Sequence, residues 1–229
     1  MLVGDFEQHF RTVVLDSGGE VIPETESETA DFLFAKENVV AELKTLQEDA
    51  RREHAMKLQG LVNDWMKRGL MLIYGRVQIS LQNLNPTCQR EWLEALQAPV
   101  QRIIHKANRQ IRATKQSRGL TDAKGLLIIA NDGNLLHTNP IDYMILVSHV
   151  LKKKKQTGER QFPNIAGVIY FSYRIPSRNE GLPFWIAGDT ETAGDPIMRS
   201  LQEKLKSGWF SYIGRITGMP VTELLRPVI

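Results

Sequence analysis

Two short apolar segments near the start of the chain, residues 30–35 and 38–46, are separated only by Lys36 and Glu37. Each segment has the length of a β-strand and is too short for a typical buried helix. Because so few residues connect them, we predict a β-hairpin whose two strands are both largely buried. Isolated charges interrupt the apolar pattern at three positions, which are Asp31, Glu42 and Lys44.

The register of this hairpin follows from the length of its turn. With a two-residue loop, Ala35 pairs with Asn38. The same register places Asp31 directly opposite Glu42, and the Cβ atoms of such a facing pair are about 4.5–5.5 Å apart. Side chains alternate between the two faces of a strand, so Lys44 lies on the same face as Glu42.

Two facing carboxylates on buried strands repel each other, and burying them without partners is costly. A divalent cation removes both difficulties, and oxygen ligands suit Mg²⁺ or Mn²⁺, which also accept phosphate oxygens. Lys44 beside such an ion would orient or deprotonate an attacking water, or stabilise a negatively charged transition state. The alternative is a salt-bridged hairpin in which Glu42 pairs with Lys44 and Asp31 is merely an acid at a strand end. The surrounding apolar residues leave no solvated face, which argues against it.

The spacing of these residues resembles a known enzyme family. Asp31 followed by Glu42-Leu43-Lys44 on the next strand is similar to the core of the PD-(D/E)XK nucleases, the restriction-endonuclease-like superfamily. Gln47 extends the resemblance to the E-x-K-x-x-Q variant of that motif. The close resemblance covers about residues 5–47. This chain departs from the pattern at Ala30, where many of these nucleases have proline.

The resemblance carries implications for fold, chemistry and ligands. It implies a restriction-endonuclease-like α-β-β-β-α-β core and Mg²⁺-assisted hydrolysis of phosphodiester bonds, usually in DNA. It also implies that an acid on the first helix joins the metal site, and Glu7 is the natural candidate. Asp31 and Glu42 would be the principal metal ligands, Lys44 would activate the attacking water, and Gln47 would support the nucleophile geometry.

Hydrophobic periodicity predicts an α/β fold, with a mixed central β-sheet flanked by helices. We expect one domain over residues 1–229, with residues 48–98 as a helical insertion within it. The predicted helices are residues 5–15, 48–67, 85–115, 139–152 and 196–213. The predicted strands are residues 21–22, 30–35, 38–46, 125–130, 165–173 and 183–187. Residues 70–85 are ambiguous, and a kink is expected at Pro99.

Basic residues recur at helical spacing on the predicted helix 85–115, at Arg102, His105, Arg109 and Arg112. Such a stripe either follows a phosphate backbone or is a solvated helix face, and the sequence leaves both open. Gln110 lies on the flank of this helix nearer its apolar side, from which it could approach the active site. The lysine run 152–155 ends another predicted helix, and we interpret it as complementing the helix dipole.

Composition sets broader limits. The net charge of +3 and the pI of about 9.0 are compatible with nucleic-acid binding without requiring it. The single cysteine excludes an internal disulfide or a multi-cysteine zinc site, which favours a reduced, cytoplasmic setting. Early acidic residues argue against a secretory signal, and no apolar run approaches the roughly 18 residues that span a bilayer.

The leading hypothesis is a Mg²⁺- or Mn²⁺-dependent endo- or exonuclease acting on DNA, in which Arg102, Arg109 and Arg112 contact the nucleic acid. The alternative is a catalytically inactive nuclease-fold module that binds nucleic acid or docks a partner. A third hypothesis is an interaction protein with a fortuitous motif. A homodimer or a partner subunit is compatible with each of them.

Overall fold

The computed structural model describes residues 6–23, 28–75, 79, 81–134, 136, 140–172, 184–187 and 195–218. Its helices are α1 (Phe6–Asp16), α2 (Arg51–Lys67), α3 (Pro86–Ser117), α4 (Pro140–Leu151) and α5 (Pro196–Thr217), with a 3₁₀ turn η1 (Leu81–Asn83). Its strands are β1 (Glu20–Val21), β2 (Phe32–Phe34), β3 (Val39–Leu46), β4 (Lys124–Asn131), β5 (Gly167–Ser172) and β6 (Phe184–Ala187). Each predicted helix and strand is therefore present, with ends that shift by a few residues.

The described strands form one mixed sheet in the order β1-β2-β3-β4-β5-β6. The pairs β1/β2, β2/β3 and β5/β6 are antiparallel, whereas β3/β4 and β4/β5 are parallel. Parallel neighbours require a crossover connection, which α3 provides between β3 and β4, and α4 between β4 and β5. The α/β class with a mixed sheet and flanking helices is confirmed.

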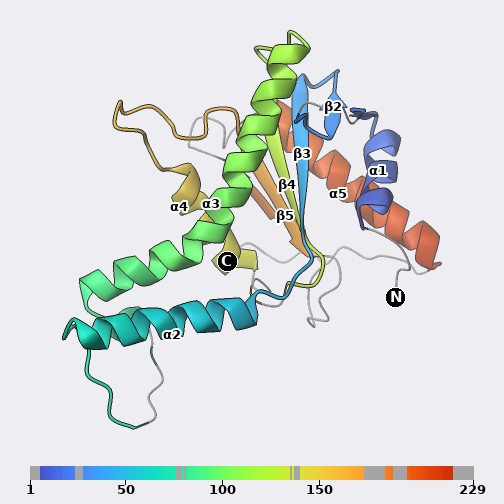
Figure 1. Ribbon diagram of the computed structural model, residues 1–229. Helices are drawn as coiled ribbons and strands as arrows, with labels where there is room; N and C mark the ends of the chain where they lie inside the picture. Colours follow the sequence, from blue (N-terminus) through green and yellow to red (C-terminus); the bar gives the residue numbers. More distant parts are fainter. Residues whose placement is uncertain are drawn as a thin grey trace.

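Helices cover both faces of this sheet (Figure 1). On β3 the odd-numbered residues Val39, Ala41 and Leu43 pack in one apolar cluster with residues of α1 and α5. The even-numbered residues Val40 and Leu46 pack in the other cluster, with residues of α3 and α4. Because side chains alternate along a strand, Glu42 and Lys44 lie on the α3 side of the sheet.

The hairpin of β2 and β3 has the predicted register. Phe32 pairs with Ala41, and Phe34 pairs with Val39, so continuing the same count aligns Asp31 with Glu42. The strand β2 is shorter than the predicted 30–35, because Asp31 lies in a bend just before it. In the connecting turn Asn38 has φ 52°, a left-handed conformation that asparagine tolerates better than most residues.

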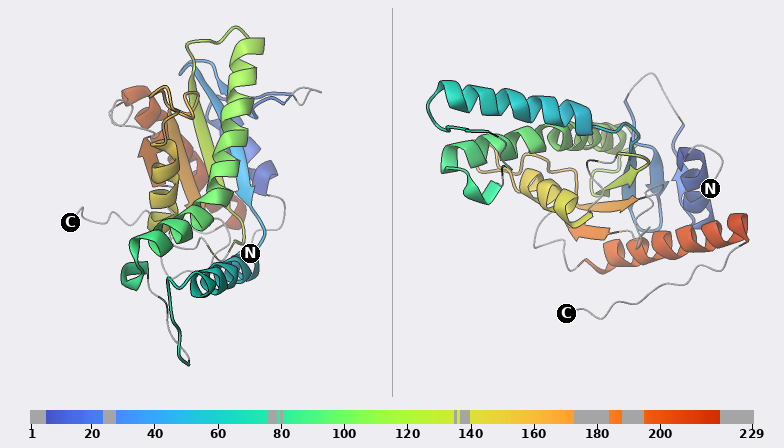
Figure 2. Two further views of the ribbon diagram at one scale, coloured as in Figure 1. Left: turned by 60° about the vertical axis from the view of Figure 1, so that its left-hand side comes forward. Right: turned by 90° about the horizontal axis from the view of Figure 1, so that it is seen from below.

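An arm built from α2 and the first part of α3 projects from the sheet (Figure 2). It has its own small apolar cluster, centred on Val62, Trp65, Leu84 and Cys88. Pro99 lies inside α3, and the helix changes direction along its length in Figure 1. The expected insertion 48–98 covers this arm, but α3 runs on past residue 98 without interruption, so its second half belongs to the main domain.

The ambiguous segment 70–85 contains no strand in its described part, and residues 76–78 and 80 lie outside the described residues. Asn85 begins α3, since its side chain accepts a hydrogen bond from the Cys88 backbone N–H. None of the described helices is both long enough and apolar enough to cross a membrane.

Candidate active site

The strand β3 carries a fully buried carboxylate. Glu42 is 0% exposed, and among the described residues it is the only buried Asp, Glu, Lys, Arg or His. Its strand neighbours Ala41 and Leu43 are buried and apolar, and on the adjoining strand it pairs with the buried Leu127. Fully buried acids are rare unless they are paired or bind a metal, so this residue requires an explanation.

Asp31 lies opposite Glu42, in the bend that precedes β2. Its Oδ2 accepts a hydrogen bond of 2.7 Å from the Leu43 backbone N–H. This bond fixes the Asp31 carboxyl against β3, in place of the backbone pairing that β2 would otherwise continue. The structure therefore brings together the two acids that the hairpin register predicted.

Lys44 completes the group. Its Nζ donates a hydrogen bond to Glu42 Oε1, and its side chain is 19% exposed where that of Glu42 is 1% exposed. The other carboxylate oxygen, Glu42 Oε2, is buried and receives no hydrogen bond from an N–H or O–H donor of the described residues, whereas the facing carboxyl groups of Glu42 and Asp31 lie close enough to share a proton. One ammonium group thus faces two carboxylates, which leaves a net negative charge when all three groups are ionised.

The pKa values of both acids are displaced upward. Burial, followed by the charge of Asp31, raises the pKa of Glu42 from 4.5 to about 8, against the opposing effect of Lys44. Burial also raises the pKa of Asp31, although the Leu43 N–H and the Lys44 charge oppose this shift. Facing carboxyl groups with raised pKa values are typical of functional sites, because structural carboxylates usually have lowered values.

A hard divalent cation fits this donor set. Both acids present oxygens from adjacent strands, and Glu42 Oε2 receives no hydrogen bond from a described N–H or O–H donor. In the described part of the chain, no group of three or more His, Cys, Asp or Glu side chains has metal-binding spacing. Two carboxylates with the remaining ligands from water and phosphate are typical of Mg²⁺ and differ from a closed structural metal site.

Neither of the two supporting residues expected from the resemblance has a described hydrogen bond to the acids. Glu7 on α1 forms an ion pair of 2.9 Å with Arg11, although its charge contributes to raising the pKa of Asp31. Gln47 directly follows β3 and is exposed. In the region that the structure describes, no hydrogen bond links the Gln47 side chain to Asp31 or Glu42. Their roles in the site stay predictions.

The helix α3 holds the backbone just before Asp31. Thr114 Oγ1 accepts a buried hydrogen bond of 2.7 Å from the Ala30 N–H. Gln110 Nε2 donates one of 3.1 Å to the Thr29 carbonyl, so Gln110 contacts the backbone two residues before Asp31, while no described hydrogen bond joins it to the acids themselves. Thr114 was not predicted from the sequence. Its signal is a polar residue within the apolar stripe that includes Ala107 and Ile111.

The basic residues predicted to contact nucleic acid are all exposed on α3. Arg109 forms an ion pair of 2.5 Å with Glu28, and Arg102 lies close enough to α2 to lower the pKa of Glu53. Arg112 has no carboxylate partner in the described residues. Their exposure is compatible with both interpretations of the basic stripe.

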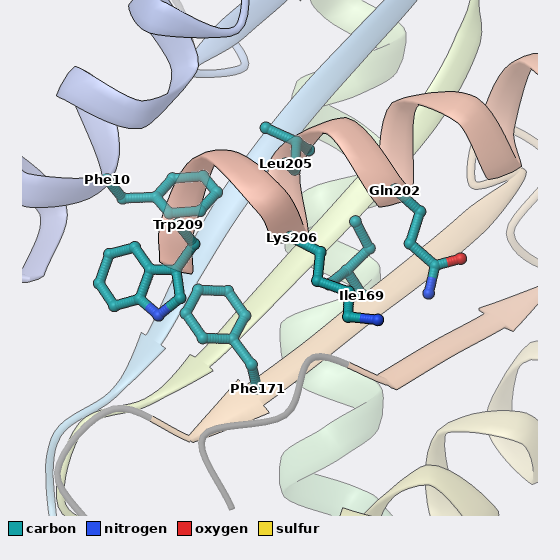
Figure 3. Close-up of a pocket in the computed structure, with 7 residues that line it drawn as sticks. All are labelled: Phe10, Ile169, Phe171, Gln202, Leu205, Lys206 and Trp209. Atoms are coloured by element: carbon teal, nitrogen blue, oxygen red, sulfur yellow. The ribbon is translucent and has the colours of Figure 1, made fainter. Parts of the chain in front are cut away.

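Two cavities lie on opposite faces of the sheet. A cavity of about 90 Å³ lies on the α3 side, beyond Lys44 along β3, with Leu46, His54, Arg102 and Ile103 in its wall. The second cavity lies between the sheet, α1 and α5, and Figure 3 shows its lining residues. These are Phe10, Ile169, Phe171, Gln202, Leu205, Lys206 and Trp209. The second cavity lies on the face that Glu42 does not share, so we do not connect it with the acids.

The arrangement of Asp31, Glu42 and Lys44 is thus suited to cation-assisted chemistry on an oxyanion such as a phosphate. Comparison with protein-family models, curated proteins and solved structures finds no match to this chain, so the interpretation of the site rests on its own geometry.

Proposed function

We propose that this protein is a Mg²⁺- or Mn²⁺-dependent nuclease that hydrolyses phosphodiester bonds in DNA. The observation that carries the proposal is the pair of facing acids, the buried Glu42 and Asp31, whose pKa values are both raised and in which one Glu42 oxygen receives no hydrogen bond from a described N–H or O–H donor. Lys44 beside this pair supplies the third group of the site.

The groups around Glu42 compensate its burial only in part, because its pKa is raised to about 8 although Lys44 opposes the shift. Removing an ionised carboxylate from water costs several kcal/mol, and an ion pair compensates only when its geometry and other hydrogen bonds are satisfied. Lys44 satisfies one Glu42 oxygen and leaves the other, while Asp31 adds a repelling charge. A valine or isoleucine would fill this strand position at no such cost, which supports a functional reason for the acid.

Asp31 and Glu42 would hold the cation. When bound there, Mg²⁺ or Mn²⁺ would supply Lewis-acid polarisation of the phosphate and a lowered pKa of its bound water. The Leu43 N–H fixes the Asp31 carboxyl, and Thr114 fixes the backbone at Ala30, so the protein holds the acids before the substrate arrives. Such preorganisation removes reorganisation cost from the reaction.

The proposed task of Lys44 is to act on the attacking water and the phosphate. Its Nζ is anchored by Glu42 Oε1, while its side chain retains partial exposure toward solvent. From this position an ammonium group can hydrogen-bond the oxygen of an attacking water. It can also stabilise the negative charge that develops on the phosphate oxygens. Glu7 and Gln47 are proposed to support the cation and water geometry from the periphery.

The order of elements also supports the proposal. The chain runs α1, β1, β2, β3, α3, β4, with α2 inserted before α3. This order agrees with the α-β-β-β-α-β order that the PD-(D/E)XK resemblance implies, with Asp31 in the bend just before β2 and Glu42 and Lys44 on β3. The superfamily assignment is part of our proposal.

A second candidate function is an inactive nuclease-fold module that binds nucleic acid or docks a partner. The Lys44–Glu42 ion pair favours it, because the lysine then neutralises the acid for structural reasons alone. In that case the protein would bind DNA and cut none. The same experiment separates the two candidates.

The experiment is a cleavage assay on supercoiled plasmid and on end-labelled linear duplex, with Mg²⁺, Mn²⁺ or EDTA. The variants are Asp31→Asn, Glu42→Gln and Lys44→Met. Removing one such group typically lowers the rate by about 100-fold or more. Glu48→Gln is the matched control, since this exposed acid lies two residues beyond β3. Wild-type cleavage that persists in EDTA, or that all three variants retain, would contradict the proposed site.

A further inference from the structure

Two segments of the chain concentrate its positive charge. Residues 101–118 contain six Lys and Arg and no Asp or Glu, and residues 152–160 contain five Lys and Arg and one Glu. Together they hold eleven of the 29 basic residues but one of the 26 acidic residues. The remainder of the chain is therefore net acidic, although the whole has a charge of only +3. Charge separation on this scale concerns partners more than fold.

The fold places these segments side by side. Lys154 and Arg160 form an isolated antiparallel bridge, so residues 152–160 form a hairpin, which we call the basic hairpin. Lys153 Nζ donates a hydrogen bond of 2.7 Å to Gln101 Oε1 on α3. Just beyond the hairpin, the Asn164 N–H donates one of 3.0 Å to Asn108 Oδ1. The base of the hairpin therefore contacts α3, and the loop that contains the hairpin extends from the end of α4 in Figure 1.

The helix dipole explains little of this lysine run. The helix α4 ends at Leu151, and the run continues into the hairpin. The Lys153 side chain contacts α3 rather than the end of α4. The interpretation from sequence thus applies at most to Lys152, next to the helix end.

Several of these cations are exposed and carry no compensating charge. Arg109 and Lys155 pair with Glu28 and Glu159. Six others are exposed and lie beyond ion-pair distance of every described carboxylate; these are Arg102, Lys106, Arg112, Arg118, Lys152 and Lys154. Like charges on adjoining elements repel one another, and a polyanionic partner would relieve this repulsion when it binds.

We propose that α3 from residue 101 to 118 and the basic hairpin together bind the sugar–phosphate backbone of duplex DNA. We call this the α3–hairpin surface. From Arg102 to Arg118 the helix rises about 24 Å, which matches roughly seven base pairs along a duplex. The assignment rests on the proposed nuclease function, because it supplies the surface that holds the substrate while the acids act.

The chemistry of the surface favours nucleic acid over other acidic partners. Neither segment contains a large exposed apolar side chain, although both are fully described. Membrane-surface helices need such side chains to enter the lipid, and protein interfaces are usually anchored by buried aromatic or aliphatic residues. A surface made mainly of cations, with amide and hydroxyl groups between them, fits a repeating phosphate chain.

The surface also adjoins the candidate site through one helix. The inner face of α3 packs against β3 and holds the backbone before Asp31 through Thr114. The outer face carries Lys106 and Arg112. DNA bound to this outer face therefore lies on the same side of the sheet as Glu42 and Lys44.

The test is a binding titration of the full-length protein, without divalent cations and in EDTA, by fluorescence anisotropy. The probe is a labelled DNA duplex of about 20 base pairs, titrated from about 50 to 200 mM salt. Two variants each remove two charges, Lys106→Gln/Arg112→Gln and Lys152→Gln/Lys154→Gln. The control is Lys36→Gln/Lys67→Gln, which removes the same charge from exposed positions outside the surface.

In each surface variant the slope of log K against log salt concentration should become less negative by about 1.8, because each lost phosphate contact contributes roughly 0.9 to the slope. Its affinity at low salt should fall by about tenfold or more. The control should match the wild type, and circular dichroism should show equal folding. Unchanged slopes in both surface variants, or an equal loss in the control, would overturn the assignment. So would variants that weaken binding to anionic vesicles while duplex DNA does not bind.

These results are independent of catalysis. Steep salt-dependent binding that the surface variants lose, together with no cleavage under any divalent cation, supports the surface and rejects the nuclease. If the wild type cleaves DNA and both surface variants bind DNA as tightly as the wild type does, the results support the nuclease function and reject the surface.

Discussion

Replacing Glu42 by glutamine should stabilise the metal-free protein and, under the proposed function, abolish the cleavage of DNA. In the folded protein the pKa of Glu42 is raised from 4.5 to about 8, mainly by burial and then by Asp31. The folded state therefore holds the Glu42 proton more tightly than the unfolded state does. Between pH 4.5 and pH 8 the unfolded chain has released this proton, while the folded protein must retain it or bury a charge.

This difference in proton binding determines the sign of the pH dependence of stability. Stability is unaffected by this group below pH 4.5 and declines as the pH rises toward 8. One pKa unit corresponds to about 1.4 kcal/mol, so the full shift sets an upper limit of roughly 5 kcal/mol. The coupling with Asp31 and Lys44 makes a loss of about 2 to 4 kcal/mol a reasonable expectation. Glutamine keeps an oxygen that accepts the Lys44 hydrogen bond and has no proton to lose.

The assay is urea-induced unfolding in EDTA at pH values from 5 to 9, for wild type, Glu42→Gln and the control Glu48→Gln. The free energies of unfolding of wild type and Glu42→Gln should be close at pH 5 and diverge as the pH rises, with the variant more stable. Saturating Mg²⁺ should then stabilise the wild type at pH 8 and leave the variant unchanged. A variant that is less stable than the wild type at pH 8 in EDTA, or that retains the full pH slope, would refute the reasoning.

Two further substitutions test the supports of the site. Thr114→Val removes the acceptor of the buried Ala30 N–H, so the free energy of unfolding should fall by about 1–3 kcal/mol and cleavage should slow. Chemical denaturation measures the first effect and a cleavage assay the second. An unchanged free energy of unfolding would contradict the role of this bond. Gly125→Ala would place a Cβ 1.8 Å from the Asn164 carbonyl oxygen, so the variant should fail to fold. Gly60→Ala is the control, because nothing lies within 4 Å of the added Cβ, and this substitution should stabilise α2 by about 1 kcal/mol. Cooperative thermal unfolding of both variants would contradict the prediction, because it would show that the backbone at Asn164 can move away from residue 125.

The hairpin was predictable because local rules determine it. A short turn and a two-residue side-chain period fixed the register, so Asp31 and Glu42 could be aligned from the order of residues alone. The early end of β2 was not predictable in the same way. It depends on the Asp31 side chain accepting the Leu43 N–H, a choice between backbone and side-chain pairing that strand patterns do not encode.

Contacts between distant segments were the part that sequence did not reveal. The bond from Ala30 to Thr114 joins residues 84 positions apart, and the basic hairpin meets α3 across a gap of 52 positions. The basic stripe on α3 was therefore predictable, whereas its neighbour in space was not. The positions of Glu7 and Gln47 relative to the acids could not be predicted from the sequence either. Glu7 pairs with Arg11 on its own helix, and Gln47 lies just after the strand that carries Lys44.

Pro99 lies near the point at which α3 passes from the apolar cluster of the arm to the cluster over the sheet, and Leu96 just before it already packs against the latter. Before it, Cys88 packs within the small cluster of the arm; after it, Val100 and Ile104 pack over the sheet. Proline has no N–H to continue the hydrogen-bond ladder, yet it suits the first turn of a helix. Substitutions or changes of length in the arm before Pro99 can therefore leave the packing of the second half of α3 on β3 unchanged. The arm is free to diverge while the helix that supports Asp31 stays in register.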